Sequence, residues 1–305
     1  MSNASIAVFL LTYNEEMHIA RALASVATFA SEIYVVDSYS TDKTVDIAKA
    51  AGAQVVFRVF DNQARQFNWA LDTIATASEW ILRLDADEII ETDLADRLPV
   101  RLAELGSDVV GVQLNRKHIF MGRWIRHGGR YPLRLLRIWR RGYGRIEDRW
   151  MDEHVVVTGG RSVTFEGGFS DHNLNNLSYF IAKHNQYATR EAVEILNRRH
   201  GMLFAGSSLS ATSGSKQAAA KRWLKENIYG RLPFWMGPTL YFIYRMIFQL
   251  GFLDGREGFL YHVFQGFWYR LLVEAKVLEF EAELKRERSP QKKLSRLREL
   301  TGLEL

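Results

Sequence analysis

Short, uninterrupted apolar runs alternate with amphipathic stretches along residues 5–115, and this alternation constrains the fold more than any other feature. The expected strands are 6–11, 33–36, 54–59, 80–84 and 109–114. The expected helices are 15–28, 41–51, 63–77 and 93–105. Strands without polar alternation are buried on both faces, and intervening helices favour a parallel sheet. We therefore expect an α/β fold with a mostly parallel, Rossmann-like sheet and helices on both faces.

Acidic residues follow two of the expected strands. Asp37 ends the second strand, and Asp85-Ala86-Asp87 follows the fourth. Ligands of such sheets bind at the carboxyl ends of the strands. In an extended segment alternate side chains share a face, so Asp85 and Asp87 could converge on one divalent cation that also binds nucleotide phosphates. A solvated turn that caps a helix is the alternative.

The first expected strand leads into Thr12-Tyr13-Asn14-Glu15-Glu16, which contains no glycine. A dinucleotide-binding enzyme would need G-x-G-x-x-G at this point, so that class is excluded. Thr12 or Asn14 could instead cap the helix that follows.

Composition narrows the chemistry further. The chain has 305 residues and no cysteine, which excludes disulfides, thiolate metal sites and cysteine nucleophiles. Its net charge of +5 suits an anionic substrate, an anionic membrane surface or nucleic acid. The basic stretch 116–150 permits nucleic-acid binding, but that function leaves Asp37, Asp85 and Asp87 unexplained, so we expect no nucleic acid as a partner. The acidic pair also argues against a catalytically inactive scaffold.

The last third of the chain changes character. Small residues at 206–215 indicate a boundary between a catalytic domain (1–205, with a donor half 1–115 and an acceptor half 116–205) and a helical region (206–305). The uncharged runs 232–244 and 246–253 are shorter than the roughly 20 residues that span a bilayer. With their many aromatics they favour helices that lie in the membrane interface, and a soluble helical subdomain is the alternative. The first residues do not resemble a signal peptide, so we expect the catalytic part in the cytoplasm.

Four motifs in order give the sequence a specific likeness. They are Thr12-Tyr13-Asn14-Glu15, Val35-Val36-Asp37-Ser38-Tyr39-Ser40-Thr41-Asp42, Gln66-Phe67-Asn68-Trp69-Ala70-Leu71 and Leu84-Asp85-Ala86-Asp87-Glu88. This pattern resembles the family 2 glycosyltransferases of GT-A fold over roughly residues 4–175. It is most similar to the branch of lipopolysaccharide and lipooligosaccharide core β-1,4-glucosyltransferases. In that branch an element like Phe252–Gly258 is flanked by aromatic helices that lie against the membrane.

The resemblance implies a nucleotide-sugar pocket formed by Thr12, Tyr13, Asn14, Glu15, Asp37, Gln66, Asn68, Asp85, Ala86 and Arg137. Asp37 would accept the imide N–H of uracil. Asp85 would meet the ribose or the sugar, and Arg137 could bind the diphosphate. Asp87 would ligate the cation, Mn²⁺ or Mg²⁺. His172 would contact the metal or the diphosphate, unless it is only a surface histidine.

An inverting transferase also needs a general base that takes the proton of the acceptor hydroxyl. The candidates lie in Arg149-Trp150-Met151-Asp152-Glu153-His154-Val155. Glu153 aligns best with the branch's His-Glu pair, although Asp152 departs from the pattern. Asp152 is the second candidate, in which case Glu153 would orient it. We expect His154 to be structural.

The resemblance therefore implies an inverting, metal-dependent transfer of one hexose, with glucose expected. The donor would be a UDP-sugar, and the acceptor a lipid-linked glycan of lipopolysaccharide or exopolysaccharide biosynthesis. The enzyme would act at the cytoplasmic face of the inner membrane. The sequence has no Gln-x-x-Arg-Trp element of processive synthases, which favours single additions. The alternative is a polyprenyl-phosphate sugar synthase, in which phosphate is the nucleophile and needs no strong base.

Overall fold

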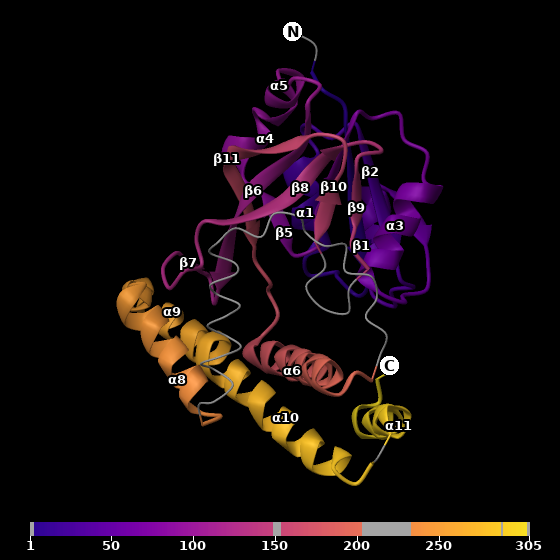
Figure 1. The fold of residues 1–305 in the computed structure, drawn as a ribbon. Coiled ribbons are helices and arrows are strands. Elements are labelled where there is room, and N and C mark those ends of the chain that lie inside the picture. The colour runs from indigo at the N-terminus through magenta and orange to yellow at the C-terminus, as the bar shows by residue number, and fades with distance from the viewer. Residues whose placement is uncertain (1–2, 149–153, 203–232, 288, 304–305) are drawn as a thin grey trace. The chain divides into compact units, whose positions relative to one another are not determined.

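The computed structural model describes residues 3–148, 154–202, 233–287 and 289–303 (Figure 1). The chain divides into two compact units, Met1–Leu174 and Asn175–Leu305. The boundary expected at 205/206 lies outside the described residues. The helix at 177–200, which we expected in the catalytic domain, belongs to the second unit.

The first unit alternates strands and helices as expected. Its strands are β1 (Ile6–Thr12), β2 (Glu32–Asp37), β3 (Gln54–Phe57), β4 (Trp80–Arg83), β5 (Glu88–Ile90), β6 (Val109–Phe120), β7 (Arg123–Ile125), β8 (Leu133–Arg140), β9 (Gly144–Ile146), β10 (Val155–Val157) and β11 (Arg161–Asp171). Its helices are α1 (Ile19–Val26), α2 (Thr44–Ala50), α3 (Gln63–Thr73), α4 (Thr92–Ala95) and α5 (Leu98–Ala103). The expected helix at 93–105 is two helices, because a proline fits only the first turn of a helix and Pro99 lies in the first turn of α5.

The main sheet has the strand order β3-β2-β1-β4-β8-β6-β11-β5, with β7 paired to β6. Strands β1 to β4 pair in parallel. Strand β8 is antiparallel to both β4 and β6, and β11 is parallel to β6 but antiparallel to β5. The sheet is therefore mixed, and the expectation of a mostly parallel sheet is right only for its first half. Beyond residue 109 short connections replace the helices, and only antiparallel neighbours can be joined in that way.

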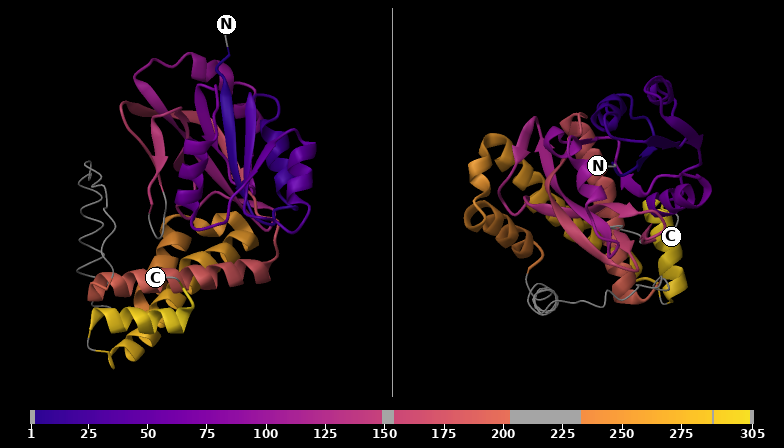
Figure 2. Two further views of the ribbon diagram at one scale, coloured as in Figure 1. Left: turned by 90° about the vertical axis from the view of Figure 1, so that its right-hand side faces the viewer. Right: turned by 90° about the horizontal axis from the view of Figure 1, so that it is seen from above.

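Helices cover both faces of the sheet, as predicted (Figures 1 and 2). Alternate side chains of β1 point to opposite faces. Leu10 belongs to a core that includes residues of α1, α2, α4 and α5. Phe9 belongs to a second core with Phe67 of α3 and Ile146 of β9. The two cores fix the sheet between its helical layers.

The carboxyl ends of β1, β2 and β4 meet at one edge of the sheet. Thr12 at the end of β1 lies opposite Asp37 at the end of β2. Strand β4 ends at Arg83, and the segment 85–87 follows it directly. The acids that the sequence singled out therefore lie at the edge where such sheets bind ligands.

The second unit is helical, as expected. It contains α6 (Leu177–His200), α8 (Met236–Ile243), α9 (Gly255–Tyr261), α10 (Tyr269–Leu284) and α11 (Pro290–Thr301), with π-helical turns at Tyr244–Phe248 and His262–Trp268 and a 3₁₀ turn at Gly251–Asp254. Leu196 of α6 packs in one core with Val277 and Phe280 of α10 and Leu297 of α11. Over the residues that are described, no helix combines the length and hydrophobicity that a membrane crossing requires.

Candidate active site

The loops after β1 and β2 are fastened to each other by side chains. The Asn14 N–H donates to Ser40 Oγ at 2.8 Å, and the Thr41 N–H donates to Asn14 Oδ1 at 2.8 Å. Asn14 has a φ of 53°, a left-handed conformation that asparagine tolerates better than most residues. The Glu15 N–H donates to Thr44 Oγ1 at 2.7 Å. These hydrogen bonds fix the predicted donor loop against the segment that follows β2.

Asp37 lies at the centre of this arrangement and is 0% exposed. Its Oδ2 accepts the hydroxyls of Thr12 at 2.8 Å and Ser40 at 2.6 Å, and its Oδ1 accepts the Ser40 N–H at 2.7 Å. In this structure the carboxylate organises the two loops. The contact of Asp37 with uracil stays a prediction. Both carboxylate oxygens of Asp37 already accept hydrogen bonds within the protein, so uracil would have to share one of them.

The other predicted donor residues of this region separate into two groups. Tyr13 presents a ring that is 59% exposed, and Gln66 Nε2 donates to Ser38 Oγ at 2.8 Å. Asn68 is engaged elsewhere, because its amide donates to the Ile146 carbonyl at 2.8 Å and accepts the Ile146 N–H at 3.0 Å. Gln66 therefore adjoins the loop after β2, whereas Asn68 joins α3 to β9.

The segment Asp85-Ala86-Asp87 is a turn and not the extended segment that we expected. The Glu88 N–H donates to the Asp85 carbonyl at 2.9 Å. The chain reverses here because β5 leaves β4 and pairs with β11 at the far end of the sheet order. As a consequence the two carboxylates have different partners.

Asp85 lies between two arginines. Arg83 Nε is 3.4 Å from Asp85 Oδ1, and Arg137 Nη2 is 3.2 Å from Asp85 Oδ2. Burial alone would raise the pKa of Asp85, but Arg83 and Arg137 outweigh it and lower the pKa to about 2. Asp85 is therefore ionised at neutral pH, so both of its oxygens act only as hydrogen-bond acceptors.

Arg137 also donates a hydrogen bond to the Glu88 carboxyl, is 6% exposed, and lies over the Phe169 ring at 4.9 Å. Burial raises the pKa of Glu88 to about 8; the Asp85 and Asp171 carboxylates add to this shift and Arg137 opposes it. The structure thus assigns Arg137 to two carboxylates, whereas we expected it to contact the diphosphate. Glu88 and Arg83 were not among the predicted site residues, although both are charged residues at or just after an apolar strand.

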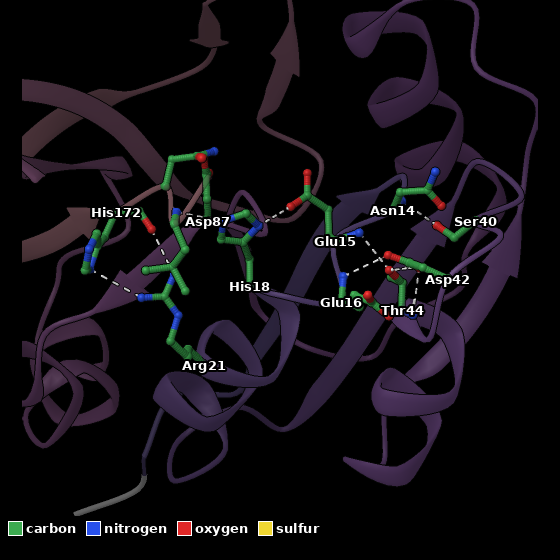
Figure 3. Close-up of polar contacts among 12 residues, drawn as sticks. Asn14, Glu15, Glu16, His18, Arg21, Ser40, Asp42, Thr44, Asp87 and His172 are labelled. Carbon is green, nitrogen blue, oxygen red and sulfur yellow. Dashed lines mark hydrogen bonds and ion pairs between the residues drawn. The ribbon is translucent and has the colours of Figure 1, made fainter. Parts of the chain in front are cut away.

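Asp87 is held by the segment 172–174, which we call the strap (Figure 3). The His172 N–H donates to the Asp87 carbonyl at 3.0 Å, and Asn173 Nδ2 donates to Asp87 Oδ2 at 3.0 Å. The strap is anchored in turn by Arg21 of α1, which donates to the His172 carbonyl at 2.8 Å. Asn173 and Arg21 were not among the predicted site residues.

The residues present fit a hard cation at Asp87 but not at His172. Arg21 Nη1 lies 3.3 Å from His172 Nδ1, and an arginine can only donate. Nδ1 therefore accepts and the neutral ring keeps its proton on Nε2, so neither nitrogen offers a lone pair to a metal in this arrangement. Burial and then Arg21 lower the pKa of His172, which favours that neutral ring.

No group of three or more His, Cys, Asp or Glu side chains suited to a metal occurs within the described ranges. Mg²⁺ commonly binds through one or two carboxylates plus substrate phosphates and water. The Asp87 oxygens fit that mode of binding.

The predicted general bases cannot be placed. Glu153 and Asp152 lie outside the described residues. His154 is exposed, and its carbonyl accepts the Glu147 N–H at 2.9 Å. The roles of Glu153 and Asp152 stay predictions.

Comparison with known proteins identifies the family. The family model described as Glycosyl transferase family 2 matches residues 7–172. An uncharacterized glycosyltransferase of Rickettsia bellii is 42% identical over 103 residues, 34% of each chain, so the match spans about a third of that relative's length. The lipopolysaccharide core biosynthesis glycosyltransferase LpsC of Rhizobium meliloti is 28% identical over 193 residues, which cover 61% of this chain and 70% of LpsC.

Among solved structures, the glucosyl-3-phosphoglycerate synthase of Mycobacterium tuberculosis shares 26% identity over 38% of this chain and 44% of that one, with a TM-score of 0.32. The family model covers more than half of the chain, including the donor loop, the Asp85–Asp87 turn and the start of the strap. The chain therefore belongs to glycosyltransferase family 2.

Proposed function

We propose that this enzyme transfers a single hexose, with glucose expected, from a UDP-sugar to a lipid-linked glycan of lipopolysaccharide or exopolysaccharide biosynthesis, with inversion and with a divalent cation. The observation that carries the donor part is the Asp85–Asp87 turn at the carboxyl end of β4. One carboxylate is held ionised by two arginines, and the other is held by the strap. The similarity to LpsC supports a glycan of the lipopolysaccharide core.

Each part of this edge has a role in donor binding. Asp87 would hold the cation, which offsets the charge of the leaving nucleoside diphosphate. Asp85 accepts hydrogen bonds from hydroxyl groups of the ribose or the sugar, and Arg83 and Arg137 keep Asp85 ionised. Tyr13 offers an exposed aromatic face to the base at the end of β1.

The donor proposal is tested by calorimetric titration with UDP, GDP and dTDP, each with and without Mn²⁺. We expect UDP-selective binding that Mn²⁺ strengthens and that Asp87→Ala weakens. Asp108→Asn is the matched control, because Asp108 pairs with the exposed Arg161 at the opposite edge of the sheet. Equal affinity for the three nucleotides, or no effect of Asp87→Ala, contradicts the proposal.

The acceptor step requires an oxygen nucleophile that attacks the anomeric carbon opposite the leaving diphosphate. Glu153 is the proposed base, with Asp152 as the second candidate. Glu153→Gln should lower the turnover of a hydroxyl acceptor by about 10²–10⁴-fold, the usual contribution of general base catalysis. Full activity of both Glu153→Gln and Asp152→Asn would favour a polyprenyl-phosphate sugar synthase, whose nucleophile is already ionised.

A surface of the second unit supports a lipid-linked acceptor. Large apolar side chains are exposed just before and along α8, along α9 and in the turns between them. They are Phe234, Trp235, Leu240, Ile243, Tyr244, Ile247, Phe248, Leu250, Phe252, Leu253 and Phe259. Phe248 is 74% and Ile247 is 58% exposed. Patches of this kind mark sites of interaction, and the net charge of +5 favours an anionic partner surface. We therefore propose that this surface lies on the cytoplasmic face of the inner membrane.

Sedimentation with vesicles tests this membrane contact. Wild-type protein should bind vesicles rich in phosphatidylglycerol better than neutral phosphatidylcholine vesicles. Replacing Ile247 and Phe248 by serine should weaken that binding, whereas Leu278→Ser on α10, which is similarly exposed, serves as the control. Equal vesicle binding by the wild type and both variants would contradict the proposal, and a loss of self-association instead of vesicle binding would identify a second copy as the partner.

A further inference from the structure

His18 is a buried polar residue that the donor chemistry does not use. It is 2% exposed and lies just before α1. The Leu174 N–H donates to His18 Nε2 at 2.9 Å, so Nε2 carries no proton. Nδ1 therefore carries the proton of the neutral ring, and it donates to Glu15 Oε2 at 2.6 Å. Both ring nitrogens are used, each toward a different segment.

These two segments carry different parts of the proposed donor site. Figure 3 shows Glu15 on one side of His18, and Asp87 and His172 on the other. Glu15 lies in the loop after β1, whose backbone is fastened to Thr44. Leu174 is the last residue of the strap, and its neighbour Asn173 donates to the Asp87 carboxylate. Hydrogen bonds therefore link the donor loop to Leu174 through His18, and the adjacent residue Asn173 hydrogen-bonds the Asp87 carboxylate.

Arg21 provides a second attachment from the same helix face, because residues three apart are neighbours on a helix surface. It contacts His172 at the carbonyl and at the ring. The strap is therefore held at its first residue by Arg21 and at its last by His18. Asn173, which contacts Asp87, lies between the two attachments.

We propose that His18 and Arg21 are positioning residues that set Asp87 for the cation. They fix the strap, and the strap fixes Asp87 through the Asn173 amide and the His172 N–H. His18 also links this arrangement to Glu15, so the donor loop and the cation site are set together. The inference rests on the proposed donor chemistry and adds to it two residues that touch neither nucleotide nor cation.

The expected effect is on the cation rather than on the nucleotide. Loss of a group that orients a metal ligand typically weakens the affinity for the metal by about 10–100-fold. His18→Leu removes both hydrogen bonds and should raise the Mn²⁺ concentration for half-maximal binding to the UDP complex by roughly that factor. UDP affinity without Mn²⁺ should change much less. His18→Gln keeps an oxygen that can accept the Leu174 N–H, and it should recover part of the Mn²⁺ affinity.

The test measures free Mn²⁺ by electron paramagnetic resonance during titration of each UDP complex, together with amide exchange at Leu174. Arg21→Gln acts on the other end of the strap and should also weaken the binding of Mn²⁺ to the UDP complex. Thr76→Val is the matched control, because Thr76 hydrogen-bonds the Glu32 carboxylate away from the site, and its loss should lower only the thermal stability.

Weaker Mn²⁺ binding in His18→Leu and Arg21→Gln, with faster Leu174 exchange in His18→Leu, supports the proposal. If these variants lose stability as Thr76→Val does but bind Mn²⁺ as the wild type does, the residues are merely structural and the proposal is overturned. If the wild-type protein itself shows no Mn²⁺-dependent UDP binding, the proposed donor chemistry fails and the positioning role fails with it.

Discussion

Replacing Glu88 by glutamine should remove a pH dependence of stability that this one carboxyl creates. The Glu88 pKa is about 8 in the folded chain against an ordinary value of 4.5, mainly because the group is buried. Between these values the folded state binds a proton that the unfolded state releases. The free energy of unfolding therefore falls as the pH rises, by at most about 1.4 kcal/mol per pH unit. Glutamine resembles the protonated acid and does not titrate.

The assay is urea unfolding of the wild type and Glu88→Gln at pH 5.5, 6.5 and 7.5. The wild type should lose stability across this series, and the variant should lose less. Asp85 contributes no slope there, because its pKa is about 2 and it is ionised in both states. Glu79→Gln is the control, since Glu79 is a half-exposed partner of Arg140 and its replacement should leave the slope unchanged. Equal slopes in the wild type and Glu88→Gln would refute the reasoning.

Three further substitutions test the packing of the site. Arg137→Met removes the cation that opposes the raised pKa of Glu88 and that lowers the pKa of Asp85, and it should cost about 3–5 kcal/mol in urea unfolding at pH 7; wild-type stability would contradict this. Asn68→Ala removes both hydrogen bonds to the Ile146 backbone and should cost about 1–3 kcal/mol in urea unfolding. Calorimetry should show unchanged UDP affinity, and weaker UDP binding would instead support the predicted contact of Asn68 with the donor. Gly168→Ala would place a Cβ 2.0 Å from the Asn115 carbonyl oxygen, so we expect about 3 kcal/mol or more of destabilisation in thermal unfolding. Wild-type stability would contradict this.

The donor half of the fold could be predicted because its signals are local. Each run such as 6–11 or 33–36 is apolar throughout, and a strand buried on both faces requires this. The acids after these strands could also be placed at one edge, because parallel strands end together. The mixed half could not be predicted in this way. Strand β11 pairs with both β6 and β5, and it does so with register shifts around Gly168 that have no periodic pattern.

The roles of individual side chains depended on partners far away in the sequence. Arg137 and Arg134 both interrupt an apolar strand, but only Arg137 meets Glu88, which lies 49 positions away, and nothing in the sequence between them marks that pairing. His18 is a similar case, because Leu174 is 156 positions away. The sequence motifs identified the groups with chemistry. Their orientation depends on packing between distant segments, which no local pattern encodes.

The central claim is tested most directly by sugar transfer in the presence of membranes. Purified enzyme would be incubated with labelled UDP-glucose and other UDP-hexoses, with Mn²⁺ and with lipid-linked glycans extracted from the source cells. The account predicts that label from one UDP-hexose enters the lipid-linked fraction, that UDP is released in equal amount, and that chelation or Asp87→Ala stops both. Label that never enters this fraction, or transfer that continues after chelation, would contradict it.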